Sequence, residues 1–344
     1  MDTKEVDETR RDKFLIIGCS GAIGLQLAEK LVNIYGDQSV IAALHRSPLP
    51  EHLVSRCICE FGFNILDNET IVALLAKYGK RIRGIWNLAA PLSVDTAKDP
   101  AKAHDVTVGG MRRLLEAMRA HEGLDTIYFS DSIGSYGCDA PRENASVEWL
   151  VGNPTQDPGS DYGIQKREIR ELLAQYHREH HFDCRFAIIP GVLHTGATWG
   201  GGTTEYALDA LFAASKGEHY ACPISETERL PMIHSTDLIE GLIALMTAPA
   251  ETFPFEKLGG VPIAGFSFSP SDLFATITKK LPSFEGKFSY DEAVNPSAAD
   301  FAKKWPNSLD SSEAASYINF SATRGIEETV DEILAAHRER IEHS

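Results

Sequence analysis

A glycine-rich turn between an apolar run and an amphipathic segment places the strongest limit on the fold of this chain. The run Phe14-Leu15-Ile16-Ile17 is long enough for a strand that is buried on both faces. The turn Gly18-Cys19-Ser20-Gly21-Ala22-Ile23-Gly24 follows at once. The apolar residues that come next recur at helical spacing: Ile23, Leu27, Leu31 and Ile34. A strand, a glycine turn and a helix in this order favour a dinucleotide-binding unit over an ordinary βα turn.

Each glycine of this turn has a separate physical task in that interpretation. Gly18 allows the tight turn, Gly21 lets the backbone approach a pyrophosphate, and Gly24 lets helix and strand pack closely. The first N–H groups of the helix then point at the phosphates. We therefore predict that the turn supplies cofactor contacts from Gly18, Ser20, Gly21, Ala22, Ile23 and Gly24.

The rest of the chain predicts an α/β fold, a Rossmann-type doubly wound parallel sheet with a smaller C-terminal substrate-binding lobe. Strand-like runs lie at 39–44, 84–90, 124–129 and 185–189, and 63–67 looks like the turn after a third strand. Helical patterns lie at 102–120, from 161 onward, 205–215, 237–247 and 325–342, with a loop over 138–159. We assign 1–12 to a flexible tail, 13–190 to an NAD(P)-binding Rossmann domain and 191–344 mainly to the substrate-binding lobe. Some elements of that last part are expected to return to the core.

The charge balance limits the partners. Lys and Arg number 33 against 49 Asp and Glu, a formal net charge of −16, which argues against nucleic acid or an anionic membrane as a partner. The polar, acidic start and the lack of a long apolar run predict a cytoplasmic protein. Six scattered cysteines predict reduced thiols, and His177, His180 and His181 are interpreted as surface residues. We expect no metal site.

The end of the second strand bears on the choice of cofactor. An acid there would bind the ribose 2′-OH of NAD, whereas an arginine would accommodate the 2′-phosphate of NADP. The strand ends in Leu44-His45-Arg46, without an acid. We predict NADP, bound through Arg46 and His45, with NAD as the alternative. Asn64 could offer its amide to adenine or cap the next helix. Further cofactor contacts are expected from Ile65, Leu88, Ala89, Ala90 and Pro190.

A tyrosine and a lysine four residues apart form the candidate catalytic pair. Ser160 is a suitable N-cap for a helix that places Tyr162 and Lys166 on one face. Ser132 follows the fifth strand, at the sheet edge where ligands of α/β proteins bind. Each residue alone has an ordinary explanation, but three together behind a glycine turn predict an enzyme. Tyr162 and Lys166 are also predicted cofactor contacts.

The expected chemistry is a proton transfer coupled to hydride transfer. A free phenol has a pKa of about 10 and is a weak base at pH 7, and a neighbouring ammonium favours the phenolate. Lys166 can supply that charge to Tyr162 and also bond the nicotinamide ribose. The Ser132 hydroxyl can donate and accept, so it can orient a substrate hydroxyl. Together these groups would remove an O–H proton while hydride leaves carbon.

These residues resemble the extended short-chain dehydrogenase/reductase superfamily over nearly the whole chain. The resemblance rests on 18–24, Asn87-Leu88-Ala89-Ala90, 130–137, Tyr162 with Lys166, and Pro190-Gly191. The second half is similar to short-chain-type L-threonine 3-dehydrogenases, on these segments: Gly200-Gly201-Gly202-Thr203-Thr204-Glu205-Tyr206-Ala207, Leu230-Pro231-Met232-Ile233-His234, Gly265-Phe266-Ser267-Phe268-Ser269-Pro270 and Trp305-Pro306-Asn307-Ser308-Leu309-Asp310.

That resemblance implies a function and a substrate site. The family oxidises L-threonine at its 3-hydroxyl to 2-amino-3-oxobutanoate with NAD, which implies substrate contacts from Ser93, Ser132, Tyr162 and Thr204. The chain departs from the family pattern at three single positions, where Leu44 replaces an acid, Thr107 an asparagine and Ile188 an arginine. It also departs at 311–319, where the C-terminal pattern of the family is only partly present.

The leading hypothesis is an NAD(P)-dependent oxidoreductase that interconverts a small β-hydroxy (amino) acid and its β-keto product, as a homodimer. The alternatives are an NADPH-dependent reductase of a β-keto or other carbonyl compound, a nucleotide-sugar epimerase or dehydratase, and a cofactor-sensing binding protein.

Overall fold

A seven-stranded sheet forms the centre of the protein. The computed structural model describes residues 11–196, 202–254 and 258–342. The strands run in the order β10-β6-β5-β4-β1-β2-β3, and every neighbouring pair is parallel. Their bounds are Lys13–Ile17 (β1), Val40–Leu44 (β2), Ile58–Phe61 (β3), Ile82–Asn87 (β4), Thr126–Ser132 (β5), Asp183–Ile189 (β6) and Gly259–Pro262 (β10). The predicted Rossmann-type fold is confirmed.

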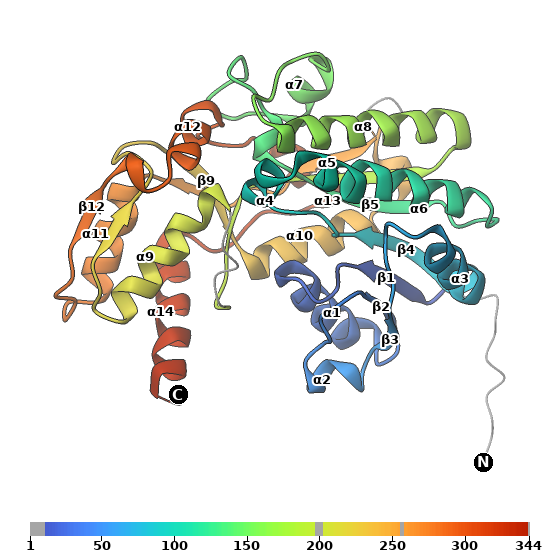
Figure 1. Ribbon diagram of the computed structural model, residues 1–344, viewed down its shortest axis with the longest axis horizontal. Helices are drawn as coiled ribbons and strands as arrows, with labels where there is room; N and C mark the ends of the chain where they lie inside the picture. The colour runs from blue at the N-terminus through green and yellow to red at the C-terminus, as the bar shows by residue number, and fades with distance from the viewer. Residues whose placement is uncertain (1–10, 197–201, 255–257, 343–344) are drawn as a thin grey trace.

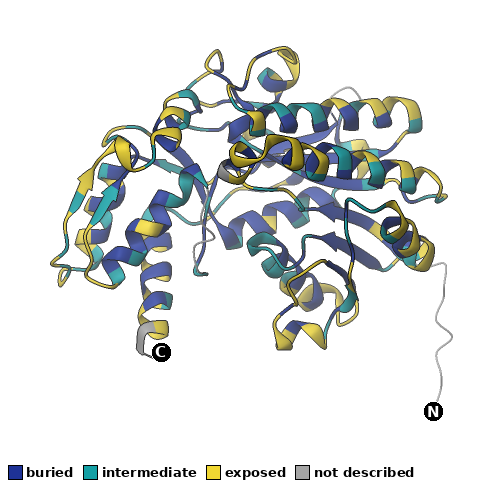
Figure 2. Ribbon diagram, viewed as in Figure 1, coloured by how far each residue is buried: buried dark blue, intermediate teal, exposed yellow. Residues whose placement is uncertain are grey.

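Alternating side chains of the strands build two apolar layers, one on each face. Leu15, Ile17 and Ile41 belong to one core cluster, and Phe14 and Ile16 belong to the other. Figure 2 shows the resulting burial of the sheet between its helices. The first face is covered by α3 (Asn68–Tyr78), α6 (Gly110–Arg119) and α8 (Asp161–His180), and the second by α1 (Ala22–Tyr35), α10 (Ser235–Thr247) and α13 (Ser312–Ile318) (Figure 1).

One edge strand comes from the second half of the chain. β10 pairs in parallel with β6, with Gly260 opposite Phe186. A side chain at Gly260 would overlap the ring of Phe186, so the two strands approach closely there. The segment after residue 190 therefore supplies both a separate lobe and a strand of the central sheet.

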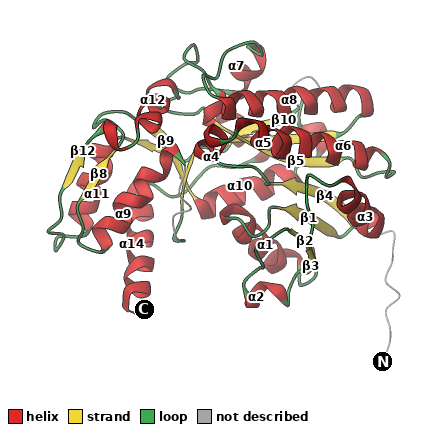
Figure 3. Ribbon diagram, in the orientation of Figure 1, coloured by secondary structure: helices red, strands yellow, loops and turns green. Residues whose placement is uncertain are grey.

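The C-terminal lobe is smaller and mixes short strands with helices (Figure 3). α14 packs against α9 and α11. A three-stranded sheet has the order β11-β9-β7, and β12 pairs with β8. The bounds are Gly191–Leu193 (β7), Tyr206–Ser215 (α9), Tyr220–Cys222 (β8), Leu230–His234 (β9), Phe266–Phe268 (β11), Pro270–Lys280 (α11), Phe288–Tyr290 (β12), Pro296–Lys304 (α12) and Ile326–Glu342 (α14).

The expectation of one regular α-helix over 102–120 is wrong, because a π turn interrupts the helix. Helix α5 (Pro100–His104) passes through a π turn at Asp105–Gly109 into α6. The Thr107 hydroxyl in this turn lies 2.8 Å from the carbonyl oxygen of Ala103 and 2.9 Å from Oε1 of Gln165 on α8. A side-chain hydrogen bond thus joins the π turn to the neighbouring helix α8. Helical periodicity alone does not reveal such a turn.

Local capping explains two further differences. The expected loop 138–159 contains a short helix, α7 (Val147–Gly152), because the Ser146 hydroxyl accepts from the Trp149 N–H at 3.1 Å. Asp67, and not Asn64, caps α3 by accepting from Glu69 N–H at 2.9 Å. The helices α2 (Glu51–Val54) and α4 (Ser93–Lys98) complete the main elements.

Two expectations fall on residues that the structure leaves out. Most of the predicted tail 1–12 and the first two glycines of Gly200-Gly201-Gly202 lie outside the described residues. Among the helices in the described ranges, none has the length and apolar character required to cross a membrane.

Candidate active site

The turn between β1 and α1 forms a cradle for an anion. Gly18 has φ +84°, and a Cβ there would come within 3.0 Å of the backbone of Leu88 and Ala89. A Cβ at Gly24 would overlap the carbonyl oxygen of Gly18. Gly21 is the N-cap of α1 and has no capping side chain, and the first helical turn has no acidic residue. The free N–H groups and the close-packed backbone therefore fit the pyrophosphate of a dinucleotide.

Ser132, Tyr162 and Lys166 meet where β5 ends and α8 begins. Ser132 is the last residue of β5, and its hydroxyl accepts from the Gly134 N–H at 3.1 Å. Lys166 is buried, its Nζ donates to the carbonyl oxygen of Ser130 at 2.7 Å, and it lies 5.0 Å from the centre of the Tyr162 ring. The ammonium is therefore fixed beside the phenol instead of extending into solvent.

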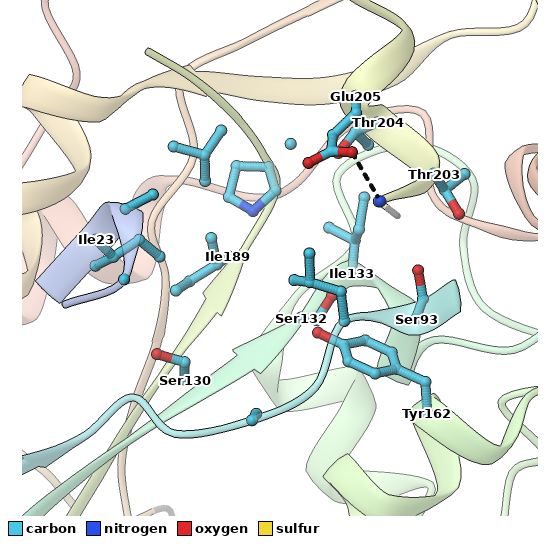
Figure 4. Close-up of a pocket in the computed structure, with 18 of the residues that line it drawn as sticks. Ile23, Ser93, Ser130, Ser132, Ile133, Tyr162, Ile189, Thr203, Thr204 and Glu205 are labelled. Carbon is cyan, nitrogen blue, oxygen red and sulfur yellow. Dashed lines mark hydrogen bonds between the residues drawn. The ribbon is translucent and has the colours of Figure 1, made fainter. Parts of the chain in front are cut away.

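Close packing of α8 on the turn after β5 sets this arrangement. The Ser160 hydroxyl caps α8 by accepting from the Gly163 N–H at 3.1 Å. A Cβ at Gly163 would overlap the carbonyl oxygen of Gly134, so only glycine permits this approach. Both the Ser132 and the Tyr162 hydroxyl point into the same cleft (Figure 4).

A buried ion pair lies directly behind Ser132. Asp131 accepts from the Ser132 N–H at 2.8 Å, from the Ser135 hydroxyl and from Arg170. The Asp131 side chain is fully buried and that of Arg170 is 8% exposed. Arg170 lies one turn after Lys166 on α8, so the pair ties the helix of the base to the strand of Ser132. No local sequence pattern predicts a role for Asp131 or Arg170, although Asp131 precedes Ser132 and Arg170 follows Lys166 by four residues.

Most of the predicted site residues line one cleft of about 360 Å³. Ser93 and Thr204, the predicted substrate contacts, line this cleft together with Tyr162 (Figure 4). The predicted residues in its lining are Gly18, Gly21, Ala22, Ile23, Gly24, Leu88, Ala90, Ser93, Ser132, Tyr162, Lys166, Pro190 and Thr204. The structure thus brings together the glycine turn, the catalytic trio and the substrate contacts.

The other predicted cofactor contacts lie outside the lining of this cleft. Ser20 is half-buried within the glycine turn, and Ala89 lines a small adjoining pocket. His45 and Arg46 are exposed just beyond β2. Asn64 and Ile65 follow β3, with the Asn64 side chain accepting from Leu66 N–H at 3.1 Å and Ile65 buried in the core. Because β4, β1, β2 and β3 are parallel neighbours, all of these positions lie along one edge of the sheet.

Some side chains in the cleft lining were not predicted as site residues. Among them are His194, Glu205 and Trp305, all from the second half of the chain. Burial, with Arg340 and His234 nearby, lowers the pKa of His194, so its imidazole is neutral at pH 7. The Glu205 carboxylate accepts from Gly202 N–H at 3.1 Å and faces the cleft (Figure 4). Glu205 and Trp305 both lie within the segments that resemble L-threonine 3-dehydrogenases. That resemblance was the only feature of the sequence that could have indicated a role for them.

A model of the NAD dependent epimerase/dehydratase family matches residues 14–257. An uncharacterized epimerase/dehydratase of Staphylococcus aureus is 30% identical over 302 residues, which cover 87% of this chain and 88% of that protein. An L-threonine dehydrogenase structure from Clostridium difficile has a TM-score of 0.86 and 29% identity, covering 96% of this chain and 99% of that one. A GalE-like L-threonine dehydrogenase from Cupriavidus necator (holo form) has a TM-score of 0.82 and 31% identity, covering 94% and 99%.

The site and these similarities define the protein as an NAD(P)-dependent dehydrogenase or reductase of the extended short-chain type. More particularly, the chain belongs to the NAD dependent epimerase/dehydratase family. The predicted resemblance to that superfamily and to L-threonine 3-dehydrogenases is confirmed.

Proposed function

We propose that the protein interconverts a small β-hydroxy acid, with L-threonine as the leading candidate, and its β-keto product. The main observation behind this proposal is that Ser132, Tyr162 and the buried Lys166 line the same cleft as the glycine turn. The nicotinamide cofactor, when bound, accepts or supplies the hydride at the substrate carbon. The Tyr162 oxygen takes the hydroxyl proton in the oxidising direction, and Ser132 orients the hydroxyl.

The lining of the cleft supports a small substrate. Among the described lining residues, Lys166 is the only lysine or arginine, and it is bound to the Ser130 carbonyl. The diphosphate of a nucleotide sugar would therefore find no free cation there. Glu205 offers a carboxylate to the ammonium group of an amino acid, and Ser93 and Thr204 offer hydroxyls. The similarity to structures named L-threonine dehydrogenase supports the same choice.

The Tyr162→Phe variant tests the assignment of the base. The change removes one oxygen and keeps the ring, so NADPH binding should stay within about twofold while turnover is lost by at least about a hundredfold. Turnover is measured spectrophotometrically with NADP and NAD against L-threonine, 3-hydroxybutyrate and acetoacetate. Retained turnover of any of these would refute the role of Tyr162.

We further propose that NADP is the preferred cofactor. β2 ends at Leu44 without an acid, and Arg46 is exposed two residues later at the cofactor edge of the sheet. Replacing Arg46 with aspartate should invert the preference, because the carboxylate repels a 2′-phosphate and can accept from a 2′-OH. An unchanged ratio of NADP and NAD dissociation constants would contradict the proposal. Lys80→Asp, the same charge change at an exposed residue just before β4, is the matched control.

A carbonyl reductase is the second candidate. The described residues of the cleft lining include no arginine that could bind a substrate carboxylate. Such a lining is also suited to a neutral ketone. Faster consumption of NADPH with neutral ketones than with β-keto acids would favour this function. An epimerase would instead convert its sugar nucleotide without net change in NAD(P)H absorbance. The homodimer and the cytoplasmic location stay predictions, to be tested by light scattering and cell fractionation.

A further inference from the structure

Trp305 forms the wall of the cleft next to the proposed base. It follows α12, it is 4% exposed, and its ring stacks on Phe301 with centroids 5.8 Å apart. A Cβ placed on Gly134 would lie 3.2 Å from both the Trp305 indole and the Tyr162 ring. The indole and the phenol thus share the surface of Gly134, and the position of one limits the space beside the other.

The backbone around Trp305 is held by a residue from the other half of the molecule. Nη1 of Arg142 donates to the carbonyl oxygens of Ala302 (3.3 Å), Lys303 (2.7 Å) and Trp305. Carbonyls at the end of a helix lack intrahelical partners, and a cation there is favoured by the helix dipole. Nη2 of the same guanidinium pairs with Glu228, whose side chain is 19% exposed.

The contact extends along both chain segments. The carbonyl oxygen of Arg142 accepts from the N–H of Asn307 at 2.6 Å. The Glu143 carboxylate accepts from the Asn307 amide and the Ser308 hydroxyl, each at 2.8 Å. Ala145 and Leu309 form a parallel bridge. The loop that leads from Ser132 to Tyr162 is therefore joined to the segment that follows Trp305.

We propose that Arg142 is a positioning residue that fixes Trp305 against Tyr162 and so sets the shape of the substrate side of the cleft. This inference rests on the proposed function, since Tyr162 is the base in it. A planar guanidinium has five N–H donors spread over three nitrogens, so it can bond several carbonyls and a carboxylate at once, whereas an ammonium has three donors on one nitrogen. Arg142 touches neither the cleft nor the reacting atoms, so it acts through Trp305.

Fluorine NMR tests the positioning without reference to the substrate. The chain has four tryptophans, so the protein labelled with 5-fluorotryptophan gives four resonances, and Trp305→Phe assigns the one that belongs to Trp305. Arg142→Met should shift and broaden that resonance, and Arg142→Lys should restore it only in part. Arg229→Met is the matched control, because Arg229 also bonds a carboxylate and a carbonyl, those of Asp272 and Ser267. An unmoved Trp305 resonance in Arg142→Met would overturn the proposal.

A kinetic cycle with L-threonine tests the consequence for the site. Misplacing a wall of the site should lower kcat/KM by about tenfold in Arg142→Met, with the dissociation constant of NADPH unchanged. In the Trp305→Phe background the same change should cost less than about twofold, because the effect passes through the indole. Equal losses in both backgrounds would overturn the proposal. If the wild type leaves L-threonine unreacted, the proposed substrate fails while the NMR result still decides the role of Arg142.

Discussion

The buried pair of Asp131 and Arg170 gives a prediction whose magnitude follows from its burial. Replacing Arg170 with leucine leaves the Asp131 carboxylate inside the protein with two remaining donors, the Ser132 N–H and the Ser135 hydroxyl. An uncompensated buried charge costs about 3–5 kcal/mol of unfolding free energy. Because Asp131 holds the Ser132 backbone, we expect kcat to fall as well.

The assay is urea unfolding followed by circular dichroism at pH 7, with equal slopes required before midpoints are compared. Arg119→Leu is the matched control: its pair with Glu116 is half-exposed on both sides, so it should cost no more than ~1 kcal/mol. Adding Asp131→Asn to Arg170→Leu removes the stranded charge and should recover about 2 kcal/mol. A loss in Arg170→Leu no larger than in the control, or no recovery in the double variant, would refute the reasoning.

Two further predictions concern α14 and the entry of α8. Burial, Arg340 and His194 lower the pKa of His337 to about 4, below the value of an unfolded histidine, so the folded state favours the neutral imidazole. The unfolding free energy is therefore unaffected by His337 protonation above pH 6.5. It falls as the pH drops from 6.5 toward 4, by at most ~3 kcal/mol, because the unfolded state binds the proton first. His337→Phe, which can keep the stack on Phe212, should flatten the fall in unfolding free energy between pH 7.5 and 5; an unchanged slope would contradict this. Gly163→Ala should destabilise by about 1–3 kcal/mol through overlap with Gly134 and lower kcat, whereas Gly152→Ala, which meets nothing within 4 Å, should do neither. A fully active Gly163→Ala would show that this close approach does not position Tyr162.

Local sequence signals were sufficient for the glycine turn and for the frame of the site. The turn 18–24 joins a strand and a helix within twelve residues, so each part constrains the next. Tyr162 and Lys166 share a helix that Ser160 caps, and both patterns are visible in one short stretch. The parallel sheet then brings Ser132 to them, because strands of such a sheet end at one edge.

Long-range contacts account for what the sequence did not predict. Arg142 and Trp305 are 163 positions apart, and their contact depends on how the lobe returns to the loop. The Asp131–Arg170 pair spans 39 positions and has no periodic signature. The π turn at 105–109 depends on Gln165 of another helix, so helical spacing predicted a regular helix instead. In each of these cases the side chain has a distant partner that the local sequence pattern does not specify.

The edge strand β10 has a consequence for the biosynthesis of the protein. Until residues 259–262 leave the ribosome, β6 has an unpaired, apolar edge that ends in buried residues. Such an edge is a template for pairing with another chain, so this interval is the time of greatest risk of aggregation during synthesis. Only the first part of the C-terminal lobe, from β7 to β9, is made within the same interval, between β6 and β10. Completion of the nucleotide-binding sheet therefore precedes the translation of the remaining lobe elements, from β11 to α14.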